Sequence, residues 1–124
     1  MKFYIYLFLS IFYSSLLLAE ALKLTAELKA GKKIALTVCS TCHGLNGQAG
    51  SAGNSVIIPN ITAQQKNYLV ARLKAYKSGG IKHPQMSVVA QMLSEQDIDN
   101  VSEWYSRIKI RIFDPNLILA KPSK

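Results

Sequence analysis

The 124-residue sequence predicts an all-α fold, because three segments carry helical patterns and the segments between them are rich in loop residues. The first helix is expected to begin near Ala26 or Lys29 and to continue through His43. Gly31 lies inside this helix at a cost of about 1 kcal/mol, which indicates close packing against another element. The chain length suits one domain of ordinary size, and no internal repeat occurs.

Two capping patterns predict where the other helices begin. Residues 62–65 (TAQQ) have the residue types of a capping box, in which a Thr hydroxyl and a Gln side chain bind free helix amides. The helix that follows is expected to end at Gly79. Residues 94–97 (SEQD) form a second such pattern and open the last helix. Its apolar stripe consists of Ile98, Val101, Trp104 or Tyr105, and Ile108.

The end of the first helix carries the motif that defines the chemistry of the chain. Residues 39–43 (CSTCH) have the C-x-x-C-H pattern by which a c-type haem is attached. At this spacing Cys39 and Cys42 can form thioethers with the two vinyl groups of one porphyrin, and His43 can bind the iron. A thioredoxin-like redox pair does not need His43 and favours a βαβ setting. A zinc site needs a fourth ligand, and the only other histidine is the distant His83. We therefore expect one covalently bound haem c.

Three side chains are candidates for the second axial ligand of the iron: Met86, Met92 and His83. Met86 is preferred, because Pro84 restricts the loop before it and an uncharged thioether favours ferrous iron. Met92 lies at helical spacing with neighbouring valines, so we expect it to pack in the core. His83 is expected on a surface loop, and its coordination would lower the reduction potential.

The N-terminal residues have the pattern of an export signal. Lys2 is followed by an apolar and hydroxyl run from Phe3 to Ala19, and the sequence AEA at 19–21 resembles a cleavage site. We therefore expect residues 1–21 to be a cleaved signal peptide, with the mature protein in the periplasm. The alternative is a retained anchor formed by residues 3–19, although this run is short for crossing about 30 Å of hydrocarbon.

The charge of the chain indicates acidic partners. Its formal net charge is +8, and an excess of Lys and Arg steers association with acidic proteins or anionic lipid head groups. The alternative is that scattered lysines only keep the protein soluble. Nucleic acid is not expected, because no recognition module is present. Both cysteines lie in the haem motif, so they leave no disulfide framework.

The order of these motifs over about residues 29 to 108 resembles class I c-type cytochromes, in particular the small soluble bacterial mono-haem members. The matching segments are Cys39 to Gly44, Pro59-Asn60-Ile61, Tyr68-Leu69 with Leu73, Pro84-Gln85-Met86, Leu93-Ser94 with Asp97-Ile98, Val101 and Trp104. The haem motif is the most specific of them. The others are weak singly, but they agree in order and spacing.

The resemblance implies orthogonal helices wrapped around one haem, with His43 and Met86 as axial ligands. It also implies that the carbonyl of Pro59 accepts a hydrogen bond from the other ring nitrogen of His43, which fixes the ring orientation. Family members often carry an arginine before the methionine. Here Lys82 takes that part of the loop, so we expect Lys82 to contact a haem propionate. Residues 109–124 extend past the usual end of the family as a basic tail, for which a packing strand, a docking tail and disorder all stay open.

These features predict an electron carrier and not an enzyme. A six-coordinate iron leaves no open position for a substrate, and no catalytic triad or carboxylate pair is evident. We expect residues 22–108 to form a periplasmic, monomeric mono-haem domain that carries single electrons between redox proteins with acidic docking surfaces. Association with a membrane surface is a further expectation. The alternatives are a haem subunit of a larger complex, and a haem protein that reacts with peroxide or small ligands through a displaceable distal ligand.

Overall fold

The computed structural model describes the backbone of residues 2–49 and 58–110, and the side chains of these residues from Leu18 onward. Every regular element in these ranges is helical. The elements are α1 (Lys2–Ile34), the π-helical turn η1 (Ala35–Cys39), α2 (Ser40–His43), α3 (Lys66–Ser78), α4 (Met86–Gln91) and α5 (Glu95–Arg107). The predicted all-α class is therefore confirmed for the described part of the chain.

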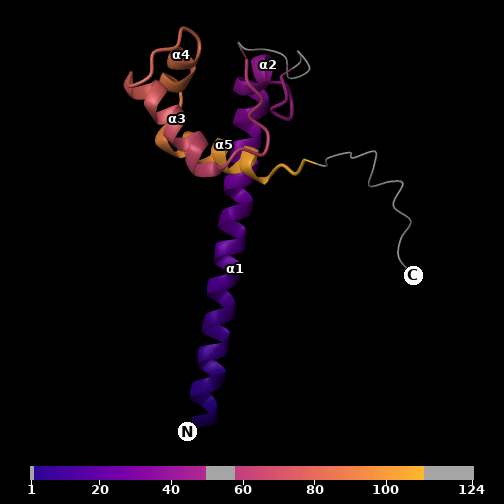
Figure 1. The fold of residues 1–124 in the computed structure, drawn as a ribbon. Coiled ribbons are helices and arrows are strands. Elements are labelled where there is room, and N and C mark those ends of the chain that lie inside the picture. Colours follow the sequence, from indigo (N-terminus) through magenta and orange to yellow (C-terminus); the bar gives the residue numbers. More distant parts are fainter. Residues whose placement is uncertain (1, 50–57, 111–124) are drawn as a thin grey trace, which may run out of the picture.

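The helices gather around the C-terminal part of α1 (Figure 1). Helix α5 crosses α1 there and contacts it, α3 packs against α5, and α4 packs against α3. The N-terminal part of α1 extends away from the other helices, so Leu18 and Leu22 are each 63% exposed. Helix α1 thus begins well before the expected start near Ala26 or Lys29.

Among the residues whose side chains are described, no helix has the length and apolar content needed to cross a membrane. Most of the expected signal or anchor segment lies outside those residues. The expected basic tail likewise lies outside the described residues beyond position 110.

Helix α5 provides the centre of the core. Its predicted capping box is confirmed: Ser94 Oγ accepts a hydrogen bond from the Asp97 amide at 3.0 Å, and the Asp97 carboxylate accepts one from the Ser94 amide at 3.0 Å. The predicted apolar stripe is also confirmed. Ile98, Val101 and Tyr105 are buried, and Val101 and Tyr105 cluster with Ala35 of η1 and Leu69 of α3.

The crossing of α1 and α5 requires a glycine. A Cβ atom on Gly31 would lie 2.0 Å from the carbonyl oxygen of Asn100 and 3.0 Å from Cβ of Trp104. The two backbones therefore approach more closely than any side chain at position 31 allows. This is the close packing that the glycine inside the first helix predicts.

The predicted capping box at residues 62–65 is wrong. Helix α3 begins at Lys66, and its N-cap residue Gln65 makes no side-chain capping hydrogen bond. The Thr62 hydroxyl instead donates to the carbonyl oxygen of Asn46. The sequence pattern therefore serves a contact between two loops. The predicted end of the helix is confirmed, because α3 ends at Ser78 with Gly79 as its C-cap.

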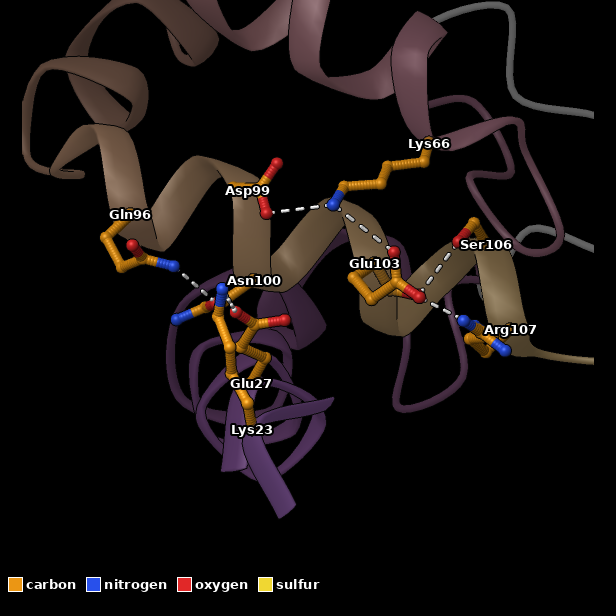
Figure 2. A network of polar contacts seen from close by, with 9 residues as sticks. All are labelled: Lys23, Glu27, Lys66, Gln96, Asp99, Asn100, Glu103, Ser106 and Arg107. Atoms are coloured by element: carbon orange, nitrogen blue, oxygen red, sulfur yellow. Dashed lines mark hydrogen bonds and ion pairs between the residues drawn. The ribbon is translucent and has the colours of Figure 1, made fainter. Parts of the chain in front are cut away.

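An ion-pair network fastens the start of α3 to α5 (Figure 2). Lys66 Nζ lies 2.8 Å from Asp99 Oδ2 and 3.3 Å from Glu103 Oε2, and Arg107 Nε lies 2.6 Å from Glu103 Oε1. The hydrogen bond from Arg107, and then that from Lys66, holds the pKa of the Glu103 carboxyl below its ordinary value. The Glu103 side chain is buried with two cationic partners, so its charge is compensated.

We predict that Gly31→Ala destabilises the haem-bound protein by about 2 kcal/mol or more, because the new methyl group forces α1 and α5 apart. The matched control is Gly80→Ala. A Cβ atom there would come no closer than 3.5 Å to any neighbour, so we expect a change below about 0.5 kcal/mol. Guanidinium unfolding measures both values, and equal stabilities of the two variants would contradict the close crossing.

Candidate haem site

The two cysteines lie where the first long helix changes its pitch. Cys39 is the last residue of the π-helical turn η1, and Cys42 lies in the short helix α2. Cys39 is half-buried and Cys42 is exposed. Residues three apart on a helix are neighbours on its surface, so this geometry suits attachment of one planar group to both sulfur atoms. No pattern in residues 35–39 indicates the π-turn, a feature that often occurs at functional sites.

His43 is the last residue of α2 and is only 8% exposed. Its Nδ1 atom lies 2.9 Å from the carbonyl oxygen of Pro59. Because a carbonyl oxygen can only accept, Nδ1 carries the proton, and Nε2 of the neutral ring keeps the lone pair that a metal requires. The contact is the one that the family resemblance implies, and the ring is chemically suited to bind iron.

The segment directly after Pro59 is held by two hydrogen bonds to the loop that follows α2. The Asn60 side chain accepts from the Ala49 amide at 2.8 Å, and the Ile61 amide donates to the carbonyl of Gly47 at 2.8 Å. These bonds fix the position of the Pro59 carbonyl beside His43. The role of Pro59 was predicted only through the family resemblance, and no pattern in the sequence indicates the supporting role of Asn60.

Helix α5 reaches the same loop through Tyr105. The carbonyl of Tyr105 accepts from the Ala63 amide at 3.0 Å. A Cβ atom on Gly47 would lie 2.8 Å from the Tyr105 ring, and the φ angle of Gly47 is +79°, so position 47 requires glycine on both grounds. Helix α5 thus packs directly against the loop that holds the Pro59 carbonyl in place.

Tyr105 also neighbours Cys39. Burial raises the pKa of the Cys39 thiol to about 11, although the Tyr105 hydroxyl partly opposes that effect. Burial, and then the proximity of Cys39, raises the pKa of Tyr105. The geometry of the pair is nevertheless poor, because the Tyr105 hydroxyl has no well-formed hydrogen bond to any described residue. The Cys39 side chain therefore lies in a largely apolar setting, packed against the core.

Met86 is the first residue of α4 and is half-buried. Figure 1 places α4 and α2 at the same end of the molecule, so Met86 and His43 belong to elements that share this end. The expected contact of Lys82 with a propionate stays a prediction. Lys82 is exposed in the loop before α4, and no described side chain forms an ion pair with it.

The prediction that Met92 packs in the core is wrong, because Met92 is 73% exposed. Helix α4 ends at Gln91, and the interior positions at this end are taken by Ala90 and Leu93. His83 also differs from the expected surface residue. It is half-buried, and its ring packs edge-on against Tyr76 with the centroids 5.8 Å apart.

Comparisons with known proteins agree with this geometry. The family model described as Cytochrome c matches residues 28–107. Cytochrome c-554(548) of Halomonas halodenitrificans is 39% identical over 71 residues, which are 55% of this chain and 81% of that protein. Cytochrome c-553 of Helicobacter pylori strain J99 is 31% identical over 71 residues, which are 57% of this chain and 71% of that protein. The crystal structure of reduced recombinant cytochrome c4 from Pseudomonas stutzeri matches with a TM-score of 0.60 at 23% identity, covering 68% of this chain and 50% of that one.

The chain belongs to the cytochrome c family. Its cofactor is a covalently bound haem c, and Cys39 and Cys42 fit the attachment motif. The two cysteine side chains, and the imidazole whose Nε2 keeps its lone pair, suit that group chemically. The class of function is that of an electron carrier.

We predict that Cys39→Ala and Cys42→Ala each yield little stable holoprotein, because one thioether is lost and a domain of this size buries only a modest core without its cofactor. The matched control is Thr41→Ala, which changes an exposed residue between the two cysteines. Covalently bound haem is measured after denaturation and extraction. Normal amounts from either cysteine variant would contradict the attachment role of that cysteine.

Proposed function

We propose that this protein is a periplasmic mono-haem cytochrome that carries single electrons between redox proteins, with His43 and Met86 as the axial ligands of its iron. The observation that carries the proposal is the 2.9 Å contact between His43 Nδ1 and the Pro59 carbonyl, because it leaves Nε2 free as a ligand. When bound, the haem supplies the one-electron Fe(III)/Fe(II) chemistry.

In this function the protein side chains bind the iron and contact a haem propionate. His43 is buried and oriented by a backbone carbonyl, so its ring needs no rearrangement when the charge of the site changes. Met86 offers an uncharged, polarizable sulfur atom, which favours the reduced state of iron. Lys82 lies in the loop before α4. We assign it to a haem propionate, because it is exposed and carries a positive charge.

Residues 1–21 act in this proposal as a cleaved export signal. The exposure of Leu18 supports it, because this apolar side chain is not part of the core of the domain. The domain would therefore keep its packing when this segment is removed. Residues 22–108 then form the electron-carrying domain.

Some cationic side chains form contacts within the domain, and others are available to attract a partner protein. Lys66, Lys74 and Arg107 are paired with carboxylates, and Lys32 lies over the Trp104 ring at 5.6 Å. Lys33 is exposed near the haem motif, and no described carboxylate pairs with it. We therefore propose that unpaired cations of this kind meet acidic surfaces of the redox partners.

We predict that Met86→Ala keeps the haem but opens the distal position of the iron. The expected changes are loss of the weak red absorption band that methionine–iron bonding gives, a lower reduction potential and new affinity of the ferrous protein for carbon monoxide. Met92→Ala is the matched control and should retain all three wild-type properties, because Met92 is exposed at the end of α4. If Met92→Ala loses the band and Met86→Ala keeps it, the ligand assignment is wrong.

We predict that Lys33→Gln slows electron transfer with an acidic redox protein by about twofold at low salt, because long-range attraction sets the encounter rate. The control is the double variant Lys74→Gln with Glu95→Gln, which removes an ion pair held at 2.7 Å without changing the net charge, and it should have a smaller effect. The difference should vanish above about 0.1 M salt, where the screening length is near 10 Å. Stopped-flow rates that do not depend on salt would show that these lysines only provide solubility.

A further inference from the structure

The first turn of α4 is capped by a side chain from outside the helix. The N-cap residue Gln85 makes no side-chain capping hydrogen bond. Instead, His83 Nδ1 accepts hydrogen bonds from the amides of Gln85, at 3.3 Å, and Met86, at 3.2 Å. Free amides at a helix start need such an acceptor, which is usually a Ser, Thr, Asp or Asn side chain. Here an imidazole nitrogen takes that place, and it holds the backbone of Met86 itself.

His83 is in turn fixed by its neighbours. Its ring packs edge-on against Tyr76 of α3 at an interplanar angle of 74°. Its amide donates to Ser87 Oγ at 3.1 Å, and its carbonyl accepts from the Ser87 amide at 3.1 Å. The Ser87 hydroxyl also donates to the carbonyl of Ile81 at 3.4 Å. The imidazole therefore connects α3 to the first residue of α4 through contacts that leave it little freedom.

We propose that His83 is a positioning residue that holds Met86 for iron binding. This inference rests on the proposed function, in which Met86 is the axial ligand. A methionine side chain has three rotatable bonds, so the position of its sulfur depends strongly on where its backbone is anchored. The acceptor nitrogen of His83 and the ring of Tyr76 supply that anchor from the side of α3.

The role of the acceptor can be separated from that of the ring. His83→Phe keeps an aromatic ring against Tyr76 but removes the nitrogen that accepts from Met86. His83→Asn removes the ring but restores a side-chain oxygen of the kind that caps helices well. Met92→Ala changes the other end of α4 and serves as the control for nonspecific loosening.

The readouts are the methionine–iron band, the reduction potential and the affinity of the oxidised protein for added imidazole, which competes with Met86. Loss of a helix cap shifts an equilibrium of this kind by about fivefold. We therefore expect His83→Phe to bind imidazole about fivefold more tightly than the wild type, with a weaker band and a lower potential. His83→Asn should stay within about twofold of the wild type, as should Met92→Ala.

The proposal would be overturned if His83→Phe kept the imidazole affinity and the reduction potential of the wild type. It would also be overturned if His83→Phe and His83→Asn weakened the methionine–iron band to the same extent. The proposed function fails separately. If the wild type has no methionine–iron band, or if Met86→Ala keeps it, then Met86 is not the ligand whatever the His83 variants do. A wild type without the band whose spectrum changes to that of an open site in both His83 variants would identify His83 as the ligand itself.

Discussion

The close crossing of α1 and α5 at Gly31 is the contact on which the rest of the structure depends. It brings the backbone of α5 against α1, the helix that leads into the haem motif. The first and last helices of the domain therefore stabilise each other. Helix α5 also contacts α3 and the π-turn that ends at Cys39. A loss of this crossing would therefore release the core and the haem motif together, and not one helix alone.

Tyr105 carries this support from the core to the site. Its ring packs against Gly47, its carbonyl accepts a hydrogen bond from the Ala63 amide, and its hydroxyl lies near Cys39. The loop that it presses upon presents the Pro59 carbonyl to His43. The packed core thus orients the imidazole through this loop. Such an arrangement suits an electron carrier, because the charge of its site changes while the positions of the side chains stay the same. The proposed ligand Met86 is held differently, because it lies at the start of a short helix and is fixed by local hydrogen bonds.

The sequence predicted those features that depend on local chemistry. The haem motif, the Ser94 capping box, the apolar stripe of α5 and the need for close packing at Gly31 all follow from residue type and spacing. It failed where distant segments decide the outcome. The Thr62 hydroxyl binds Asn46 across two loops, and no periodicity shows this. Met92 lies on the same exposed face as Val88, which is 61% exposed, and the residue types alone do not show which face of this short helix is covered. His83 caps a helix as no standard capping residue does, so residue preferences could not reveal it.

We propose that the wild-type protein is a six-coordinate, one-electron carrier. A potentiometric titration of the purified, haem-bound protein, followed by visible absorption, tests this proposal. We expect a single reversible one-electron transition, a methionine–iron band in the oxidised form and no binding of carbon monoxide by the reduced form. An oxidised form without that band, together with a reduced form that binds carbon monoxide readily, would contradict it and indicate an open distal site.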